Sequence, residues 1–253
     1  MKSVRARTSY QGVIQIVRFN WRSYLAAALG VGAAVIASPF LPYPARLMVM
    51  LCASPPLFWL ASSVVVSHYV YDRSQLYEFK WIDEVFPLAP PNWISIHSGF
   101  DETSELLAAK FPGVDFEAVD IYDPGVMTEP SIAIARRLKW SSTHAIAAHY
   151  DALPFATGSI DAAFVIFSAH ELRRHNQRVR FFTEVARILS PGGSIILVEH
   201  SRDLWNFLAF GPGVFHFFSE KAWRRAVLDA ALIVRTESSI TPFVHVYSLG
   251  RTS

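Results

Sequence analysis

The chain has 253 residues, enough for one large domain or for a domain with an appendage. Apolar residues make up 52% of it and charged residues only 17%, a balance that points toward a membrane. The net charge of +2 argues against nucleic acid as a partner, and the lone cysteine excludes a disulfide within this chain. The nine histidines show no metal-ligand spacing, so we predict no metal site.

Two long stretches without charged residues lie near the N-terminus. Residues 24–41 and 47–71 contain no Lys, Arg, Asp or Glu. Each is long enough to cross a hydrocarbon core of about 30 Å at about 1.5 Å per residue. The sequence therefore predicts two transmembrane helices that make residues 1–75 a membrane anchor. A re-entrant hairpin, suggested by Pro55-Pro56, and a buried soluble helical hairpin stay open as alternatives.

The distribution of basic residues predicts the orientation of this hairpin. Five basic residues precede the first stretch, whereas the loop between the stretches contains only Arg46. By the positive-inside rule, both chain ends lie in the cytoplasm. We therefore expect a multi-pass protein of the inner (cytoplasmic) membrane, with the lipid bilayer as a partner and the following domain on the cytoplasmic side. Residues 76–91 are predicted to be an interfacial connector at the membrane surface.

Alternating strands and helices follow from residue 92 onward. Residues 93–96 form a short apolar strand, a helix ends near Lys110, and residues 114–119 form a strand that leads into Asp120. Residues 162–167 and 195–198 are short, continuously apolar runs, as expected of strands buried on both faces of a parallel sheet. Because these strands supply their own core, we expect the domain to fold without residues 1–75.

Four sequence pieces occur in a fixed order in the second half of this domain, and together they resemble the C-terminal half of class I S-adenosylmethionine-dependent methyltransferases. The likeness is greatest to the branch that includes quinone-ring and small-lipid methylases, and it covers residues 92–250. It implies an α/β fold: a doubly wound, mostly parallel, seven-stranded Rossmann-like sheet with an antiparallel edge hairpin. It also implies a methyltransferase domain at 92–253 and S-adenosylmethionine as the cofactor. The four pieces are Asp151-Ala152-Leu153-Pro154-Phe155, Gly158-Ser159-Ile160-Asp161, the helix 181–189, and Ser190-Pro191-Gly192-Gly193 before a strand that ends at Glu199.

The loop after the first strand departs from the family pattern. The resemblance places Ser98, Gly99 and Asp101 against the cofactor. However, Ser95 stands where the family has an acid, and Gly99 alone survives of the usual glycines. Asp101 could instead cap the following helix. A loop that no longer binds the cofactor would make the chain a non-catalytic membrane scaffold, and this alternative stays open.

Two acids at the ends of later strands complete the predicted cofactor site. In this fold, the acid at the end of the second strand takes both ribose hydroxyls, and Asp120 occupies that position. Asp151 and Ala152 lie where the family contacts the adenine ring. The alternative is that Asp120 and Asp151 are ordinary turn residues.

The residues after the fourth strand face the transferred methyl group in this fold. Phe167 follows that strand and is predicted to contact the cofactor. His170, with an ordinary pKa of about 6.5, is predicted as the general base, and Glu171 would orient it. The alternative is that both residues cap the next helix.

An aromatic run broken by Gly-Pro-Gly follows the fifth strand, and we interpret it as a flap on the substrate side. His200, Trp205 and His216 are its predicted substrate-binding residues, although core packing is the alternative. The sequence thus predicts a membrane-anchored methyltransferase for a lipid-soluble acceptor, a quinone-type ring or a lipid headgroup. A methyltransferase of a soluble or protein acceptor is the remaining alternative.

Overall fold

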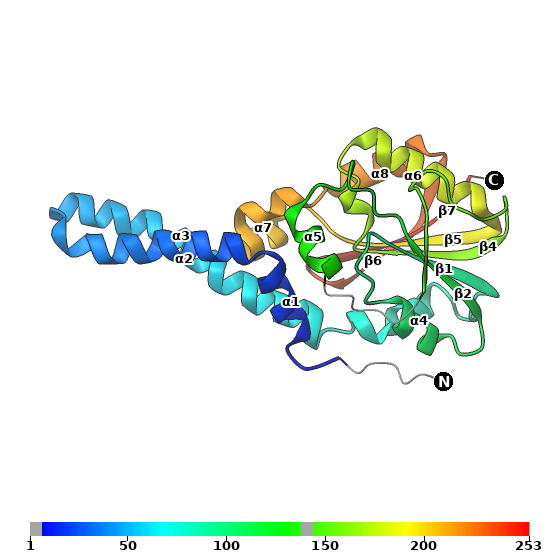
Figure 1. Cartoon of the computed structure of the whole chain (residues 1–253), viewed down its shortest axis with the longest axis horizontal. Coiled ribbons are helices and arrows are strands. Elements are labelled where there is room, and N and C mark those ends of the chain that lie inside the picture. Colours follow the sequence, from blue (N-terminus) through cyan, green and yellow to red (C-terminus); the bar gives the residue numbers. More distant parts are fainter. Residues whose placement is uncertain (1–6, 138–143, 253) are drawn as a thin grey trace.

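The computed structural model describes residues 7–137 and 144–252. A helical hairpin projects from one end of an α/β domain, in which a sheet lies between two helical layers (Figure 1). The hairpin comes from the N-terminal part of the chain, drawn in blue. The hairpin helices and the α/β domain therefore meet at one end of the sheet.

Seven strands form one sheet in the order β3-β2-β1-β4-β5-β7-β6. The strands β1 to β5 pair in parallel, and β7 runs antiparallel to both β5 and β6. This confirms the predicted sheet with its antiparallel edge. Because β1 pairs with β2 on one side and β4 on the other, the topological switch point lies at the carboxyl ends of β1 and β4. The strands are β1 (Asn92–His97), β2 (Asp115–Asp120), β3 (Ala145–Ala147), β4 (Ile160–Ile166), β5 (Leu189–His200), β6 (Leu232–Thr241) and β7 (Val244–Arg251).

Each face of the sheet is covered by its own apolar layer. On one face, α6 and α8 bring buried aromatic side chains such as Phe182 and Trp223 against Val165 and Leu197. On the other face, α4 and a series of short turns cover Trp93 and other strand residues. Burial on both faces explains the continuously apolar runs in the central strands. The helices of the domain are α4 (Ser104–Lys110), α5 (Pro130–Arg137), α6 (His175–Ile188), α7 (Leu204–Phe210) and α8 (Glu220–Asp229), with short helical turns η5 (Ala169–Glu171) and η6 (Gly211–His216).

The segment 76–91, predicted to be an interfacial connector, packs one side against the sheet. Its turns η3 (Leu76–Glu78) and η4 (Lys80–Glu84) bury Leu76, Phe79 and Ile82, each at most 1% exposed, in the layer that contains Phe164. Leu88, further along the segment, is 84% exposed. Val70, in the preceding turn η2 (Tyr69–Arg73), is also fully buried in this layer, so the α/β core extends into residues 1–75.

The hairpin consists of α2 (Trp21–Ala37), η1 (Ser38–Phe40) and α3 (Tyr43–His68). Residues 21–40 and 43–78 form helices that are long and apolar enough to cross a membrane. In the most apolar 18-residue segment of each, 0% and 6% of the residues, respectively, are buried. Pro55 and Pro56 lie inside α3 without ending it. The side chains of both helices are thus mostly exposed, unlike those of a helix in a soluble core.

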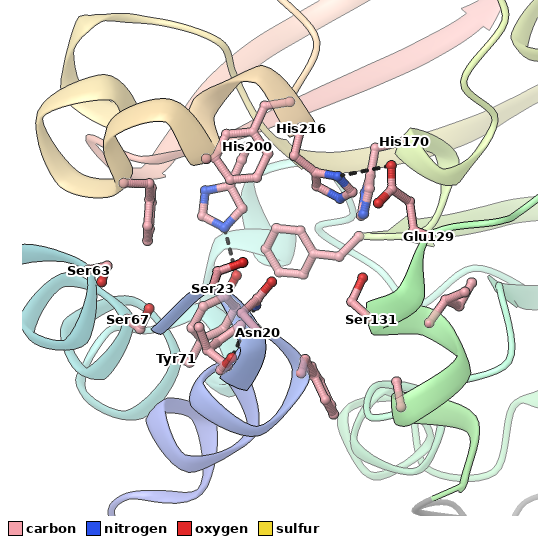
Figure 2. Close-up of a pocket in the computed structure, with 18 of the residues that line it drawn as sticks. Asn20, Ser23, Ser63, Ser67, Tyr71, Glu129, Ser131, His170, His200 and His216 are labelled. Carbon is pink, nitrogen blue, oxygen red and sulfur yellow. Dashed lines mark hydrogen bonds and ion pairs between the residues drawn. The ribbon is translucent and has the colours of Figure 1, made fainter. Parts of the chain in front are cut away.

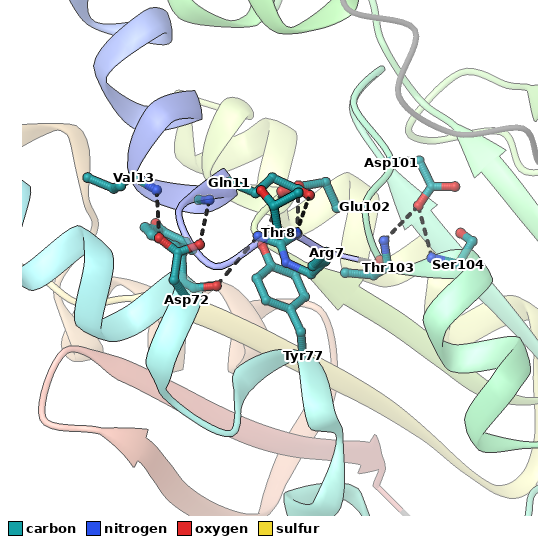
Figure 3. Close-up of polar contacts among 12 residues, drawn as sticks. Arg7, Thr8, Gln11, Val13, Asp72, Tyr77, Asp101, Glu102, Thr103 and Ser104 are labelled. Carbon is teal, nitrogen blue, oxygen red and sulfur yellow. Dashed lines mark hydrogen bonds and ion pairs between the residues drawn. The ribbon is translucent and has the colours of Figure 1, made fainter. Parts of the chain in front are cut away.

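The helix α1 (Gln11–Phe19) fastens the N-terminus to the α/β domain. Asp72 accepts hydrogen bonds from the backbone N–H groups of Gly12 at 2.6 Å and Val13 at 3.1 Å, which are otherwise unpaired donors of the first turn. Arg7 donates to Glu102, in the loop after β1, at 2.7 Å (Figure 3). The N-terminal helices therefore contact the loop that the sequence predicts to bind a cofactor.

Candidate active site

A cavity of about 800 Å³ lies between the hairpin and the carboxyl ends of the central strands (Figure 2). This volume is in the upper part of the range of about 300–1,000 Å³ found for small-molecule sites. Six of the predicted site residues line it: Ser98, Phe167, His170, Glu171, His200 and His216. The hairpin side of the wall includes Asn20, Ser23, Tyr24, Trp59, Leu60, Ser63 and Ser67.

The loop after β1 has the backbone of a ligand-binding turn. Gly99 has a φ of +93°, which is in the left-handed region that favours glycine. The Oδ1 atom of Asp101 accepts hydrogen bonds from the N–H groups of Thr103 at 3.1 Å and Ser104 at 3.0 Å, so Asp101 does cap α4 (Figure 3). Its Oδ2 atom is buried and lacks a hydrogen-bond partner in residues 7–137 and 144–252. Asp101 can therefore cap the helix and still offer one oxygen to a ligand.

The structure brings Gly99 and Asp120 together and adds Arg136 between them. Arg136 donates to Oδ2 of Asp120 at 2.9 Å, while the N–H of Tyr122 donates to Oδ1 at 3.0 Å. The same guanidinium lies against Gly99, where an added Cβ would be 1.8 Å from its Nη1 atom. Arg136 thus covers the predicted ribose site. Sequence reasoning missed it because no motif marks this position of α5.

Asp151 and Ala152 lie outside the cavity wall. The Asp151 carboxylate contacts the ring of His149 and the guanidinium of Arg180. Ala152 is exposed, and its N–H donates to the carbonyl of His149 at 3.1 Å, which closes a tight turn. This turn follows β3, the neighbour of β2, so it lies at the same edge of the sheet as Asp120.

His170 is held between two carboxylates. Its Nδ1 atom is 2.8 Å from Glu199, its backbone N–H donates to Glu199 at 3.2 Å, and its Nε2 atom is 3.5 Å from Glu171. Burial disfavours the imidazolium, but Glu199 and Glu171 together outweigh this effect and raise the pKa of His170 to about 10. His170 therefore holds its proton at neutral pH, unlike the general base with a pKa of about 6.5 that the sequence suggested. Glu199 itself was predicted only as the end of a strand.

His216 faces His170 across the cavity wall. The two rings are perpendicular, with centroids 5.0 Å apart, and Nδ1 of His216 is 3.9 Å from Glu129 (Figure 2). Burial and the charge of His170 lower the pKa of His216 to about 3, so its ring is neutral. Arg173 donates to the carbonyls of His170 at 3.1 Å and His216 at 2.6 Å. Arg173 therefore connects the backbones of two site residues.

Arg178, on α6, is a further arginine whose side chain is buried. It is 4% exposed and donates to the carbonyls of Leu172 at 2.7 Å and Arg173 at 3.0 Å. Its guanidinium lies 3.7 Å from the ring centre of Phe218, a cation–π contact. The basic residues of this region thus serve to hold loops together.

His200 belongs to an aromatic stack in the cavity wall. Its ring is stacked between Phe167 and Phe217, with centroid distances of 5.2 and 4.7 Å. Nδ1 donates to the carbonyl of Phe243 at 2.8 Å, which leaves Nε2 to accept from the Tyr71 hydroxyl at 2.7 Å. Burial lowers the pKa of His200 to about 4, so it is neutral. His200 thereby connects the end of the hairpin to the strand ends.

The aromatic run after β5 forms α7 and η6 and packs on α3. The rings of Trp59 and Phe207 are 5.5 Å apart, and Ser62 donates to the carbonyl of Leu208 at 3.2 Å. Gly211 lies directly against Trp59, since an added Cβ would be 2.4 Å from the indole. Trp205, predicted to bind substrate, is 59% exposed and does not line the cavity. The flap covers the cavity through other residues: Phe210, Pro212, Gly213, His216 and Phe217.

Comparisons with known proteins agree with this geometry. Residues 98–197 match the family model for a methyltransferase domain. No curated protein matches the chain significantly.

Solved structures match at low sequence identity. An S-adenosylmethionine-dependent methyltransferase from Aquifex aeolicus is 16% identical, with a TM-score of 0.51, and the match covers 70% of this chain and 93% of that one. The geranyl diphosphate C-methyltransferase of Streptomyces coelicolor is 15% identical, with a TM-score of 0.51 and coverage of 76% and 84%. The mitomycin 7-O-methyltransferase is 13% identical, with a TM-score of 0.52 and coverage of 97% and 74%. These structures share the fold and, at such identities, do not indicate the acceptor.

Proposed function

Since this chain is an S-adenosylmethionine-dependent methyltransferase by its domain, we propose that it is anchored in the cytoplasmic membrane and methylates a lipid-soluble acceptor, a quinone-type ring or a lipid headgroup. The observation that carries the proposal is the composition of the cavity wall. The apolar hairpin and the carboxyl ends of the strands line the same space. An acceptor in the bilayer could therefore reach the site along the helices that anchor the enzyme.

The residues of the nucleotide side fit the cofactor. Gly99 has the backbone conformation for a close approach, and Oδ2 of Asp101 is buried without a partner in the described part of the chain, which suits a cationic ammonium group. Asp120 would hold the ribose hydroxyls once Arg136 moves aside. Bound S-adenosylmethionine supplies the electrophilic methyl group. The structure thus supports Gly99, Asp101 and Asp120 as cofactor contacts.

On the acceptor side, His170 and Glu171 are the groups suited to handle charge. His170 is an imidazolium between Glu171 and Glu199, so it can donate a hydrogen bond to an acceptor oxygen and stabilise a developing negative charge. Glu171 is 6% exposed, and its Oε2 atom has no partner among the residues described. This carboxylate is the group available to take a proton from the acceptor.

The dimensions of the hairpin support a site close to the bilayer. The 26 residues of α3 span about 39 Å at about 1.5 Å per residue, longer than a hydrocarbon core of about 30 Å. The C-terminal part of α3 lines the cavity and contacts α7, whose Leu204, Trp205 and Leu208 are 67%, 59% and 42% exposed. Exposed apolar residues beside the base of an apolar hairpin are suited to the headgroup region.

The proposal is tested by incubating membranes that contain the full chain with methyl-labelled S-adenosylmethionine. We expect label in the organic-solvent extract, and a lower initial rate of labelling with the Asp120→Ala variant at S-adenosylmethionine concentrations below its Kd. Label found only in protein or in water-soluble products would overturn the lipid-soluble acceptor and favour the alternative acceptors. Failure to bind S-adenosylmethionine in calorimetry would overturn the catalytic role altogether.

A further inference from the structure

Three potential metal ligands converge in the cavity wall. His170, Glu171 and His216 each offer one donor atom, and these atoms all lie within 4.8 Å of one another. Ligands at about 2.1 Å from a tetrahedral ion are about 3.4 Å apart. Side-chain rotations that bring the three groups together by about 1 Å or a little more would therefore close a coordination site.

Each histidine already has an outer carboxylate. Nδ1 of His170 is 2.8 Å from Glu199, and Nδ1 of His216 is 3.9 Å from Glu129. In metal sites, a carboxylate on one ring nitrogen orients the histidine and makes the other nitrogen a better ligand. Figure 2 shows Glu129, His216 and His170 side by side at the cavity. His170 already has this arrangement, and Glu129 would complete it for His216 by moving about 1 Å closer.

Glu171 is the third donor: its Oε1 atom faces Nε2 of His170 at 3.5 Å, and its other oxygen is unpaired within the part of the chain that the structure describes. The residue is 6% exposed, and no group in residues 7–137 or 144–252 hydrogen-bonds to its Oε2 atom. A buried carboxylate oxygen without a partner is costly, and a bound cation offsets that cost.

The backbones that carry the three donors are held together by one side chain. Arg173 donates to the carbonyls of both His170 and His216, which joins η5 to η6. His170 and Glu171 are adjacent in η5, whereas His216 lies far along the chain in η6, which is why the spacing of the donors reveals no metal motif. The convergence exists only in the folded protein.

We propose that His170, Glu171 and His216 bind one divalent first-row transition metal ion, with zinc as the type ion, and that the ion displaces the proton from Nε2 of His170 while Nδ1 stays paired with Glu199. Two imidazoles and one carboxylate are the donor set of many catalytic zinc sites, in which a further position stays open. Imidazole donors also select against Mg²⁺ and Ca²⁺, which prefer oxygen ligands. All three donors line the cavity, so the ion would lie next to the bound acceptor. Metal binding goes beyond the proposed methyl transfer and can be measured without it.

The test uses the full-length protein in detergent, stripped of metal with EDTA. Titration with Co²⁺ should produce visible absorption bands that saturate at one ion per chain, and Zn²⁺ should displace the Co²⁺ while Mg²⁺ should not. The variants His216→Ala and Glu171→Gln should lose the bands, and Glu199→Gln should weaken binding by about ten- to a hundredfold. S-adenosylmethionine affinity, measured on the same samples, reports separately on the methyltransferase function.

A surface histidine provides the matched control. His175 lies at the start of α6, where its ring contacts Asp229 at 2.8 Å away from the cavity wall. His175→Ala should leave the Co²⁺ bands unchanged. Saturation well below one ion per chain, or bands that persist in His216→Ala, would overturn the proposal. If His216→Ala unfolds on heating at a lower temperature than wild type, His216→Gln serves as the second variant, and full Co²⁺ binding by it would contradict the site.

Discussion

Asp120 and Arg136 allow the cofactor site to be tested with two substitutions of opposite effect. In the structure, Asp120 is paired with Arg136 at 2.9 Å, and the two side chains are 21% and 35% exposed. An ion pair at this exposure contributes about 0.2–1 kcal/mol, and wild type must break it when the cofactor takes Asp120. The two hydrogen bonds from ribose to the carboxylate are together worth about 1.5–3 kcal/mol.

These free energies predict how strongly each variant should bind S-adenosylmethionine. Asp120→Ala loses the ribose hydrogen bonds but has no ion pair to break, so the net loss is about 0.5–3 kcal/mol, or about two- to a hundredfold in Kd. Arg136→Ala removes the competing guanidinium and should tighten binding by up to about fivefold. Asp115→Ala, at the exposed amino end of the same strand, is the matched control and should bind as wild type does.

The assay is isothermal titration calorimetry of S-adenosylmethionine and its demethylated product against the full-length protein in detergent. Unchanged affinity in Asp120→Ala would mean that the ribose is held elsewhere. If Arg136→Ala weakens binding as much as Asp120→Ala does, Arg136 is itself a cofactor ligand and the reasoning about competition is wrong.

Four further predictions concern the flap, the acceptor side, the contact between His200 and Tyr71, and the topology. Gly211→Ala places a methyl group against Trp59 at a residue with positive φ, so it should lower the free energy of unfolding by about 1–3 kcal/mol and lower the Tm. Gly213→Ala, which would make only ordinary contacts, should change the free energy of unfolding by no more than about 0.5 kcal/mol. Equal Tm values for the two variants would refute the packing argument. His170→Ala should keep its cofactor affinity and lower turnover by about 10²–10⁴-fold, and a loss of affinity instead would place His170 at the cofactor. His200→Ala should lower Tm as well as turnover, since it removes the partner of the hairpin's Tyr71; an unchanged Tm would show that this contact is not structural. A reporter fused to the C-terminus should be active only in a cytoplasmic location, and periplasmic activity would contradict the positive-inside argument.

Much of the sheet was predictable because its strands have a local signature. Strands buried on both faces must be apolar at every position, so β4 and β5 are visible as short apolar runs. The packing of segment 76–91 could not be predicted for a related reason. Its apolar residues indicate burial, but nothing local distinguishes burial against a membrane from burial against a sheet, and Phe79 and Ile82 pack against the sheet.

The site was predictable where its residues follow strands and not where they depend on distant partners. Asp120 and His170 could be predicted as candidates because the resemblance places site residues after the second and fourth strands, and the carboxyl ends of these parallel strands meet at one edge of the sheet. Glu199, Arg136 and Arg173 act through contacts between residues 16 to 43 positions apart, which no sequence motif records. The raised pKa of His170 could not be foreseen for the same reason, since it requires both neighbouring carboxylates to be in place.

The central claim, that the acceptor reaches the cavity from the bilayer, is tested most directly by surface dilution. The full chain is reconstituted in vesicles with the lipid extract that supplies the acceptor, and the initial rate of methyl transfer is measured at saturating S-adenosylmethionine. If the acceptor arrives along α2 and α3, the rate per enzyme should follow the acceptor's mole fraction in the bilayer and stay unchanged when the vesicles are diluted tenfold in buffer. A rate that instead falls in proportion to the bulk concentration at constant mole fraction would show that the acceptor enters from water, and would contradict the account.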